Sequence, residues 1–405
     1  MLDLRSQYLL PDDVIELRAF THGAMPRTVP EMMEHFLDDW CNLGVDAWNE
    51  VPNHWLPASN DPVGWWALPE YLGDRFIAPL IGASAGTCIM QPNVHWAMSC
   101  LLSDVERLRG RRVVVTDDAF PSILHTAHRL AELTGFRLHV ISSAPFVDRT
   151  AVLDAVKDDC ALIILSHVGF TTGERLSSSF LCEVAQQAHR HGVLVALDGY
   201  HAVGTMPIEV EDLGIDVYTA GLLKEGSGSS GTAFIYIREG LDLQPNLTGW
   251  FGDEEPFQFR EKPRINTRVR RRFLGGTTAI APLYHAVEGI RILLDAGLDE
   301  VRKDSLDKTS YCLARAAAAG LQVRSPLPAE ERSAMVIVEV ERADLFAAHL
   351  KREGVYTDSR FGRFLRLAPF VWNTLLELET AFDIIRESLR TREYLSLSEQ
   401  PGPVG

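Results

Sequence analysis

Two side chains with complementary acid–base chemistry, Asp198 and Lys224, each follow an apolar run of the chain. Residues 192–197 predict a buried parallel strand that ends at Asp198, and residues 215–223 predict a second strand that ends at Lys224. A turn rich in glycine and serine, 225–231, and a further strand over 232–237 come next. Because parallel α/β sheets bind ligands outside the carboxyl ends of their strands, we expect the carboxylate and the amine to share one crevice.

A lysine and a carboxylate in a dry crevice are the groups that pyridoxal phosphate requires. The lysine forms a Schiff base with the aldehyde, and the carboxylate keeps the pyridine nitrogen protonated, so that the ring accepts electrons. Asp198 and Lys224 therefore predict a pyridoxal phosphate site. The pair alone leaves a second interpretation open, since aspartate is common at strand ends and most lysines are solvated.

A phosphate site is predicted where a helix begins. A small-residue turn over 82–86 and a short apolar run lead to Asn93, Val94 and His95, and a helix is expected over 96–108. The start of a helix offers free backbone N–H groups and the positive end of the helix dipole, to which Asn93 and His95 add side-chain donors. A helix that begins without a ligand is the alternative interpretation.

Two further strand ends carry candidate residues. Phe120 follows a strand over 112–116 and is either a ring that stacks on a flat cofactor or a core residue beside a proline turn. Ser166 begins a segment, 166–173, that gathers hydroxyls, an imidazole and two glycines after another strand. Polar residues at successive strand ends favour one ligand site at this edge of the sheet.

Arginine and tryptophan supply further candidates. Arg366 lies in an apolar strand, where it is either a bidentate clamp for a substrate carboxylate or half of a structural salt bridge. The run over 264–272 holds five arginines and is either a solvated loop, a subunit contact or a clamp for an acidic group, of which we favour a loop at a subunit interface. Four residues near the start of the chain either line a hydrophobic substrate pocket or belong to the core: Trp48, Trp55, Trp65 and Trp66.

The elements that must position these side chains alternate between strand and helix patterns. Strands are expected over 112–116, 137–142 and 160–165, and amphipathic helices over 123–135, 149–158 and 178–192. This rhythm predicts an α/β fold with a mostly parallel sheet and helices on both faces. After about residue 281 the pattern becomes α+β, with helices over 282–296, 298–320, 343–353 and 375–390 and strands over 334–340 and 364–368.

These patterns divide the chain into four predicted parts. Residues 46–285 form a large cofactor-binding domain, and residues 286–397 form a smaller C-terminal α+β domain. Residues 1–45 pack with the small domain, and residues 398–405 form a disordered tail.

Composition limits the class of protein. The chain has 405 residues, of which 46% are hydrophobic, so a sizeable core needs no metal or disulfide. Its formal net charge of −16 argues against nucleic acid or an anionic membrane as a partner. The six cysteines lack metal-ligand spacing and predict a reducing compartment. With no secretory signal and no apolar run near the ~20 residues of a membrane span, a cytoplasmic enzyme is expected.

The motifs around these residues resemble those of fold-type I pyridoxal phosphate enzymes of the class V aminotransferase superfamily, and of kynureninases in particular. Asp198 and His201 are similar to the family's Asp-x-x-His pattern, and Lys224 is similar to its Schiff-base lysine. Further segments resemble the family over nearly the whole chain: Thr21-His-Gly23, Phe120-Pro-Ser122, Leu165-Ser-His-Val168, Gly249-Trp-Phe-Gly252, Phe273-Leu-Gly-Gly-Thr277, Asp358-Ser-Arg360 and Arg366-Leu-Ala-Pro369.

The resemblance implies a seven-stranded, mostly parallel sheet with flanking helices, and pyridoxal phosphate as the cofactor. It implies cofactor contacts for Lys224, Asp198, His201, Phe120, Asn93, Val94, His95, Ser166, Trp250 and Thr277, of which Thr277 reaches the phosphate of a neighbouring subunit. It implies substrate contacts for Arg366, at the α-carboxylate, and for Thr21.

The reaction that the resemblance implies is hydrolytic Cβ–Cγ cleavage of a kynurenine-type L-α-amino acid in a homodimer with active sites at the subunit interface. Lys224, freed by the substrate amine, would act as the base for the Cα proton, with its pKa lowered by Leu222 and Leu223.

Three departures from the kynureninase pattern keep other reactions open. Leu223 stands where kynureninases have a Tyr that binds phosphate and can donate a proton. Ile123 replaces an Asp near the cofactor, and Asn93 to His95 replace the Thr or Ser of the phosphate turn. The alternatives are β-elimination at a C–S bond, transamination, epimerisation or a decarboxylative reaction in specialised biosynthesis. A non-catalytic binding protein is a further alternative, against which the retained Asp198 and Lys224 argue.

Overall fold

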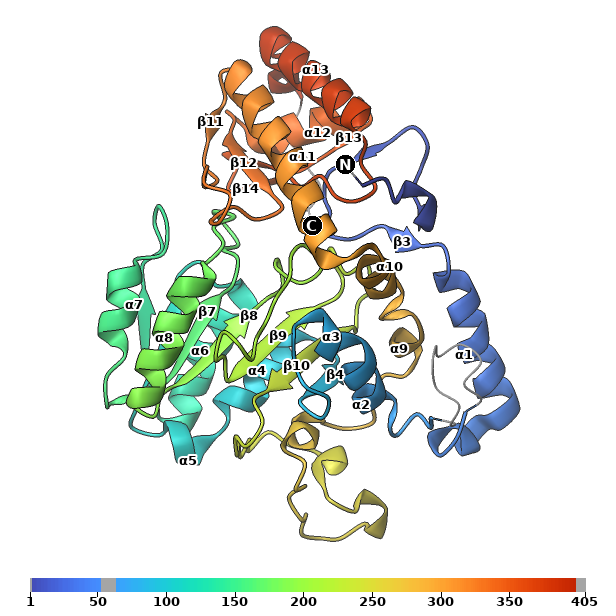
Figure 1. The fold of residues 1–405 in the computed structure, drawn as a ribbon, viewed down its shortest axis with the longest axis vertical. Helices are drawn as coiled ribbons and strands as arrows, with labels where there is room; N and C mark the ends of the chain where they lie inside the picture. Colours follow the sequence, from blue (N-terminus) through green and yellow to red (C-terminus); the bar gives the residue numbers. More distant parts are fainter. Residues whose placement is uncertain (1, 52–62, 398–405) are drawn as a thin grey trace.

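The computed structural model describes residues 2–51 and 63–397, so Trp55 and the predicted tail lie outside the described residues. Figure 1 shows a large sheet with flanking helices in the lower part of the molecule and a smaller α+β part above it. The order of the seven strands in the large sheet is β4-β10-β9-β8-β7-β5-β6. Strand β10 pairs antiparallel with both β4 and β9, the other four strand pairs of this sheet are parallel, and the expected mostly parallel sheet of seven strands is confirmed.

Strand bounds agree closely with the sequence patterns. The strands, in sheet order, are β4 (Cys88–Gln91), β10 (Ala233–Ile237), β9 (Val217–Gly221), β8 (Leu194–Asp198), β7 (Cys160–Ser166), β5 (Arg112–Thr116) and β6 (Arg137–Ile141). Every residue of β7, β8, β9 and β10 is buried, as expected for strands covered on both faces.

Helices cover both faces of the sheet. Apolar residues of α4 (Val94–Leu102) and α6 (Pro121–Thr134) join one core cluster, and those of α7 (Arg149–Ala155) and α8 (Ser178–Arg190) join the other. Sequence signals set the ends of α6, since Pro121 occupies its first turn and Gly135 follows it with a φ of 81°. Proline tolerates the first turn of a helix, and glycine adopts the left-handed conformation without strain.

Two of the expected helices are interrupted. The helix expected over 96–108 is divided into α4 and α5 (Val105–Leu108), because the Asp104 side chain accepts a hydrogen bond from the Arg107 N–H and starts a new helix. The helix expected over 282–296 is divided into α9 (Ala281–His285) and α10 (Glu288–Ala296).

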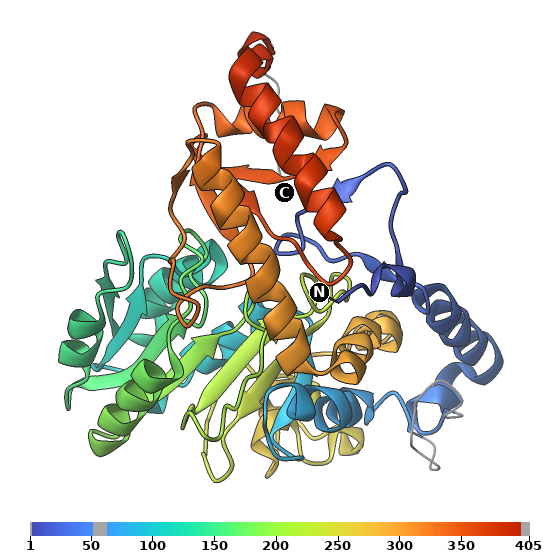
Figure 2. The same cartoon turned by 45° about the horizontal axis from the view of Figure 1, so that its top comes forward.

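The smaller part has its own sheet and core. Strands β11 (Gln322–Val323), β12 (Val336–Glu339), β15 (Phe364–Leu367) and β14 (Asp358–Arg360) form an antiparallel sheet in that order. Apolar residues of α11 (Leu298–Ala318), α12 (Ala343–Arg352) and α13 (Leu375–Thr391) pack with this sheet in a third core cluster. Figure 2 shows the long α11 running from the large part into the small one.

The N-terminal segment contacts both parts. Its strand β2 (Ile15–Glu16) pairs in parallel with β13 (Val355–Tyr356) of the smaller part. Strands β1 (Tyr8–Leu9) and β3 (Met25–Pro26) pair with each other, and α1 (Val29–Leu43) packs on α9. The proposed domain boundaries at residues 45, 285 and 397 remain predictions.

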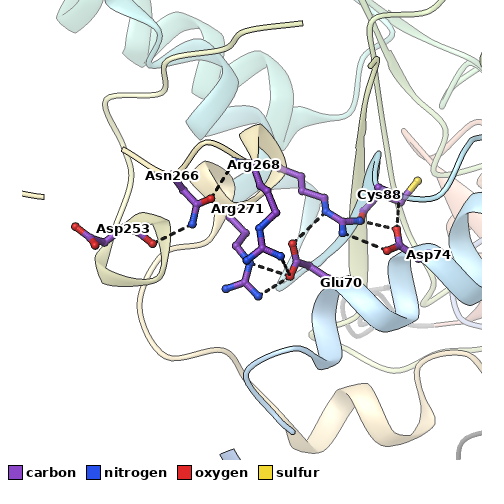
Figure 3. A network of polar contacts seen from close by, with 9 residues as sticks. Glu70, Asp74, Cys88, Asp253, Asn266, Arg268 and Arg271 are labelled. Carbon is purple, nitrogen blue, oxygen red and sulfur yellow. Dashed lines mark hydrogen bonds and ion pairs between the residues drawn. The ribbon is translucent and has the colours of Figure 1, made fainter. Parts of the chain in front are cut away.

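The arginine run is not a solvated loop. Arg270, Arg271 and Arg272 are buried, and Figure 3 shows how the run surrounds Glu70 of α2 (Leu68–Leu72). Glu70 accepts hydrogen bonds from Arg268, Arg270 and Arg271. Burial alone would raise the pKa of Glu70, but these arginines hold that pKa below its usual value. Most of the run therefore makes intramolecular ion pairs, so that it holds an acidic group of its own chain, and the contact with a second subunit remains a prediction.

Candidate active site

A cavity of about 340 Å³ lies at the carboxyl ends of the large sheet's strands. Its wall combines the ends of β7 and β8, the loop after β9, the starts of α4 and α6, strands β14 and β15, and the N-terminal segment. All of the predicted site residues except Trp250 and Thr277 line it: Thr21, Asn93, Val94, His95, Phe120, Ser166, Asp198, His201, Lys224 and Arg366. None of Trp48, Trp65 and Trp66 lines this cavity, and Trp65 belongs to the core.

Lys224 follows β9 and projects into this cavity. Its Nζ lies 2.8 Å from Nε2 of His201 and 4.4 Å from the centroid of the Tyr200 ring. Desolvation lowers the pKa of Lys224 to about 8. The backbone of the N-terminal segment closes over the loop, since Gly23 N–H donates to the Leu223 carbonyl and a Cβ on Gly23 would collide with the Lys224 carbonyl oxygen. A lysine in this setting is poised to lose its proton near neutral pH.

Asp198 ends β8 in a buried position. Its Oδ1 accepts a hydrogen bond from the Tyr200 N–H at 3.0 Å, and it makes no ion pair among the described residues. Burial raises the pKa of Asp198 to about 6. His201 is also buried, its Nδ1 has no hydrogen-bond partner in the described chain, and burial holds its pKa well below the usual value. A buried acid without an ion-pair partner and a buried imidazole nitrogen without a hydrogen-bond partner, both among the described residues, suit a polar ligand.

Tyr200 is a site residue that the sequence reasoning missed. Its ring lies under the Lys224 amine, and a Cβ on Gly221 would collide with its hydroxyl. Only glycine at position 221 therefore lets this ring lie along β9. Burial raises the pKa of the Tyr200 hydroxyl to about 12, so the group keeps its proton. The feature of the sequence that could have identified Tyr200 is its position between Asp198 and His201, at the end of a predicted strand.

The start of α4 faces the same cavity. Asn93 caps the helix, because its Oδ1 accepts a hydrogen bond from the Trp96 N–H at 2.7 Å. Nδ1 of His95 lies 2.9 Å from the Thr126 hydroxyl of α6, which fixes the orientation of the imidazole. The first backbone N–H groups of a helix have no intrahelical acceptor, so this wall of the cavity suits an anion.

Arg366 forms a structural ion pair, one of the two interpretations left open above. Its Nε and NH2 donate to the two carboxylate oxygens of Asp358 at 2.8 and 2.7 Å, and Arg360 lies 3.0 Å from the same carboxylate. The Thr21 hydroxyl donates to this carboxylate as well. Two guanidinium groups thus share one carboxylate, and this cluster leaves a net positive charge on the cavity wall.

Phe120 is not a core residue. Its side chain is 42% exposed, and its ring meets that of Phe170 edge to face, with centroids 5.2 Å apart. Ser166, at the end of β7, is buried and lines the cavity beside it. A flat aromatic ring that remains uncovered in the cavity can stack on a planar ligand.

Trp250 and Thr277 lie away from this cavity in the same chain. Trp250 belongs to an aromatic group with Trp66 and Phe257, and its Nε1 donates to the Pro256 carbonyl. Thr277 lines a separate cavity of about 250 Å³. Their contacts with the cofactor, which the resemblance implies, remain predictions.

Comparisons with known proteins agree with this geometry. Residues 84–363 match the aminotransferase class-V family, and the chain belongs to this family of pyridoxal phosphate enzymes. It is 24% identical to a kynureninase of Geobacillus thermodenitrificans over 98% of this chain and 93% of that protein. It is 30% identical to the uncharacterized aminotransferase YcbU of Bacillus subtilis over 78% of this chain and 82% of that protein.

Solved structures share the fold. A cysteine desulfurase from Thermococcus onnurineus has a TM-score of 0.80 at 20% identity, covering 96% of this chain and 98% of that one. A mutant of C-DES with glycine covalently linked to the pyridoxal phosphate cofactor has a TM-score of 0.81 at 16% identity. The match covers 95% of this chain and 99% of that one. The fold-type I architecture and pyridoxal phosphate as the cofactor, both predicted from the sequence, are confirmed.

Two further findings concern the described residues alone. None of their helices has the length and apolar character that a membrane crossing needs. They also contain no group of three or more His, Cys, Asp or Glu side chains placed to hold a metal ion.

Proposed function

We propose that this chain hydrolyses the Cβ–Cγ bond of a kynurenine-type L-α-amino acid. The observation that supports this most is the composition of the cavity wall between Lys224 and Arg366. Besides Phe120, it carries three aromatic side chains, Phe20, Phe170 and Tyr200. Such a wall suits a flat aromatic side chain on the substrate, and the cationic group at its end suits the substrate's carboxylate.

The residues of the cavity fit pyridoxal phosphate. We assign Lys224 to the aldehyde, Asp198 to the ring nitrogen, Phe120 to the ring face and the start of α4, with Asn93, Val94 and His95, to the phosphate. The unused Nδ1 of His201 and the unpaired Asp198 are the polar atoms that a bound cofactor would satisfy. When bound, pyridoxal phosphate supplies an electrophilic aldehyde and a ring that accepts the electrons of a breaking bond at Cα.

The chain's own residues then have separable tasks. Arg366 and Arg360 orient the substrate through its carboxylate, although Asp358 already occupies the bidentate edge of Arg366. Lys224, with a pKa near 8, takes the Cα proton, and the neutral His201 at 2.8 Å accepts a hydrogen bond from its Nζ. Asp198 holds negative charge in a buried position, where its interaction with a cation is strong.

Hydrolysis needs water at the substrate's γ-carbonyl and a proton at Cβ, which becomes the methyl group of alanine. Water adds to Cγ, the Cβ–Cγ bond breaks, and an aromatic acid and alanine leave. Leu223 cannot donate the proton, and we assign this task to the Tyr200 hydroxyl, which keeps its proton because its pKa is raised to about 12. The close fit of Tyr200 to Gly221 places a hydroxyl beside the strand that leads to Leu223.

A C–S lyase is the second candidate. It is favoured by Leu223, because cleavage at a C–S bond needs no proton on carbon at the leaving group, and by the likeness to C-DES, a cystine C–S lyase. A desulfurase that passes sulfur to its own cysteine is less favoured, because no cysteine lines the cavity. Burial also raises the pKa of Cys88, Cys100 and Cys312 to about 12, which makes these thiols poor nucleophiles.

One experiment separates these candidates. The holoenzyme is incubated with L-kynurenine and, in parallel, with L-cystine, and anthranilate, alanine, pyruvate and persulfide are measured. Anthranilate with an equal amount of alanine supports the proposal. Pyruvate and persulfide from cystine, without anthranilate, assign the C–S lyase, and turnover of neither substrate by a protein that holds the cofactor favours another class V reaction or the binding protein.

We further propose that the enzyme is a cytoplasmic homodimer whose active sites lie at the subunit interface. The exposed aromatic group around Trp250 and the position of Thr277 outside its own chain's cavity support this arrangement. Mixing Lys224→Ala with Thr277→Asp protein tests it, since a hybrid dimer would hold one site with both natural residues. Activity should return on mixing two variants that are inactive alone, and its absence would contradict the shared site.

A further inference from the structure

A second cavity, of about 420 Å³, shares no lining residue with the active-site cavity. It lies between the start of α8 and α11 and includes His167, Arg175, Ser178 and Arg302. The reaction proposed above uses none of these side chains.

Arginines crowd this region without acidic partners. Arg175, Arg302 and the adjacent Arg332 form no ion pair among the described residues, and their hydrogen bonds go to neutral acceptors. Arg302 donates through NH2 to the carbonyls of Ala329 and Arg332 at 2.7 and 2.8 Å. Nε of Arg175, NH1 of Arg302 and Nε of Arg332 are buried nitrogens without a partner in the described chain. Buried N–H groups are rarely left unsatisfied, so these three call for an acceptor.

Other donors converge on the same cavity. His167 is 2% exposed, and its Nδ1 lies 3.1 Å from the Tyr218 hydroxyl, while its Nε2 has no partner among the described residues. Ser178 is the first residue of α8, a helix of 13 residues whose N-terminus adds backbone N–H groups and a positive dipole end. Burial, together with Arg175 and Arg332, lowers the pKa of Arg302 to about 10, as expected for a cation that lacks a counter-charge.

We propose that this cavity binds a small anion that carries a phosphate or carboxylate group. Arg175 and Arg302 supply charge-assisted hydrogen bonds, and His167 and the start of α8 supply further donors. Glu209 and Asp212 are exposed side chains that also line the cavity, and their negative charge lowers its affinity for an anion.

Calorimetric titration of the holoenzyme at fixed ionic strength tests the proposal, with pyrophosphate as one probe and citrate as the other. Using holoenzyme keeps the cofactor's own phosphate site filled. Saturable binding is expected for at least one probe. Binding of pyrophosphate alone identifies a phosphate site, and binding of citrate alone identifies a carboxylate site. Binding of both supports a site that accepts either anionic group.

Variants tie this binding to the cavity. Arg175→Met and Arg302→Met keep much of the side-chain volume and should each weaken binding about tenfold or more. Arg190→Met, at the exposed far end of α8, is the matched control and should leave the affinity within about twofold. Asp212→Asn removes a negative charge and should tighten binding by about two- to fivefold. Because position 212 is exposed, this variant decides the question if the two arginine variants fail to fold.

Three results would overturn the proposal. The first is the absence of saturable binding with both probes. The second is equal affinity in the Arg302→Met and Arg190→Met proteins, which would place the anion elsewhere, for example at Arg360 and Arg366. The third is an unchanged affinity in Asp212→Asn.

Discussion

Nζ of Lys224 lies 2.8 Å from Nε2 of His201, and neither group forms an ion pair with a carboxylate among the described residues. Because burial keeps the pKa of His201 well below its usual value, the imidazole is neutral at pH 7 and accepts the hydrogen bond from Nζ. A neutral acceptor positions the amine without holding its proton. In the proposed function, this relationship would leave the amine of Lys224 free to attack an aldehyde and later to act as a base.

Capture of the cofactor should therefore depend on pH with a midpoint near 8. The amine of Lys224 attacks only when it is unprotonated, and desolvation lowers its pKa from the usual 10.5 to about 8. Reductive trapping of added pyridoxal phosphate on cofactor-free protein, followed by mass spectrometry of the peptide with residue 224, should rise as pH increases through 8. A midpoint near pH 10 would show that Lys224 is solvated.

Replacement of Lys224 by Ala should abolish covalent attachment of the cofactor. Purified wild-type protein should absorb near ~420 nm, as expected of pyridoxal phosphate joined to a lysine, and the variant should lose this band. Lys157→Ala, at an exposed position, is the control and should keep it. A band that survives in Lys224→Ala would place the attachment on another lysine.

Asp198→Asn should keep the fold but remove most of the activity. The carboxylate is buried with a pKa raised to about 6, so at pH 7 it carries the charge that stabilises a protonated ring. The isosteric amide lacks this charge, and removal of one such electrostatic partner costs about 10²–10³ in kcat. An activity within tenfold of wild type would show that Asp198 does not face the cofactor.

The positions of Asp198 and Lys224 were predictable, and those of Asp358 and Tyr200 were not. The first two follow continuous apolar runs, and burial on both faces of a parallel sheet fixes where such strands end. Asp358 meets Arg366 only because β14 and β15 pair antiparallel with these residues in register, and that register is set by packing of the smaller part. Tyr200 can line the cavity only because Gly221, in the adjacent strand, has no Cβ. This contact joins two strands, and the hydrophobic pattern of either strand does not predict it.

Tyr200→Phe tests the assignment of the proton donor. Loss of the hydroxyl should lower kcat by about 10²-fold and leave KM for the cleaved amino acid nearly unchanged, because the ring that contacts the substrate remains. Steady-state rates with L-kynurenine measure the change in kcat and the change in KM separately. Tyr218→Phe is the control, since that hydroxyl contacts His167 outside the active-site cavity. Equal kcat in the two variants would remove Tyr200 from the mechanism.

Glu70→Gln should destabilise the protein without touching the active site. Glu70 is buried among Arg268, Arg270 and Arg271, and the amide would leave these cations without their shared counter-charge. Loss of one partner from a buried ion-pair group costs about 3–5 kcal/mol, whereas Glu31→Gln, at an exposed position, should cost little.

The same group predicts how stability depends on pH. The pKa of Glu70 is lowered in the folded protein, so its contribution is fully present above the usual glutamate pKa of 4.5 and is lost as pH falls through the lower folded value. Denaturant unfolding followed at pH 7 and in steps below pH 4.5 should therefore show the difference between wild type and Glu70→Gln narrowing in acid. A difference that stays constant over this range would mean that charge at position 70 does not stabilise the arginine run, and that the amide acts only through altered packing.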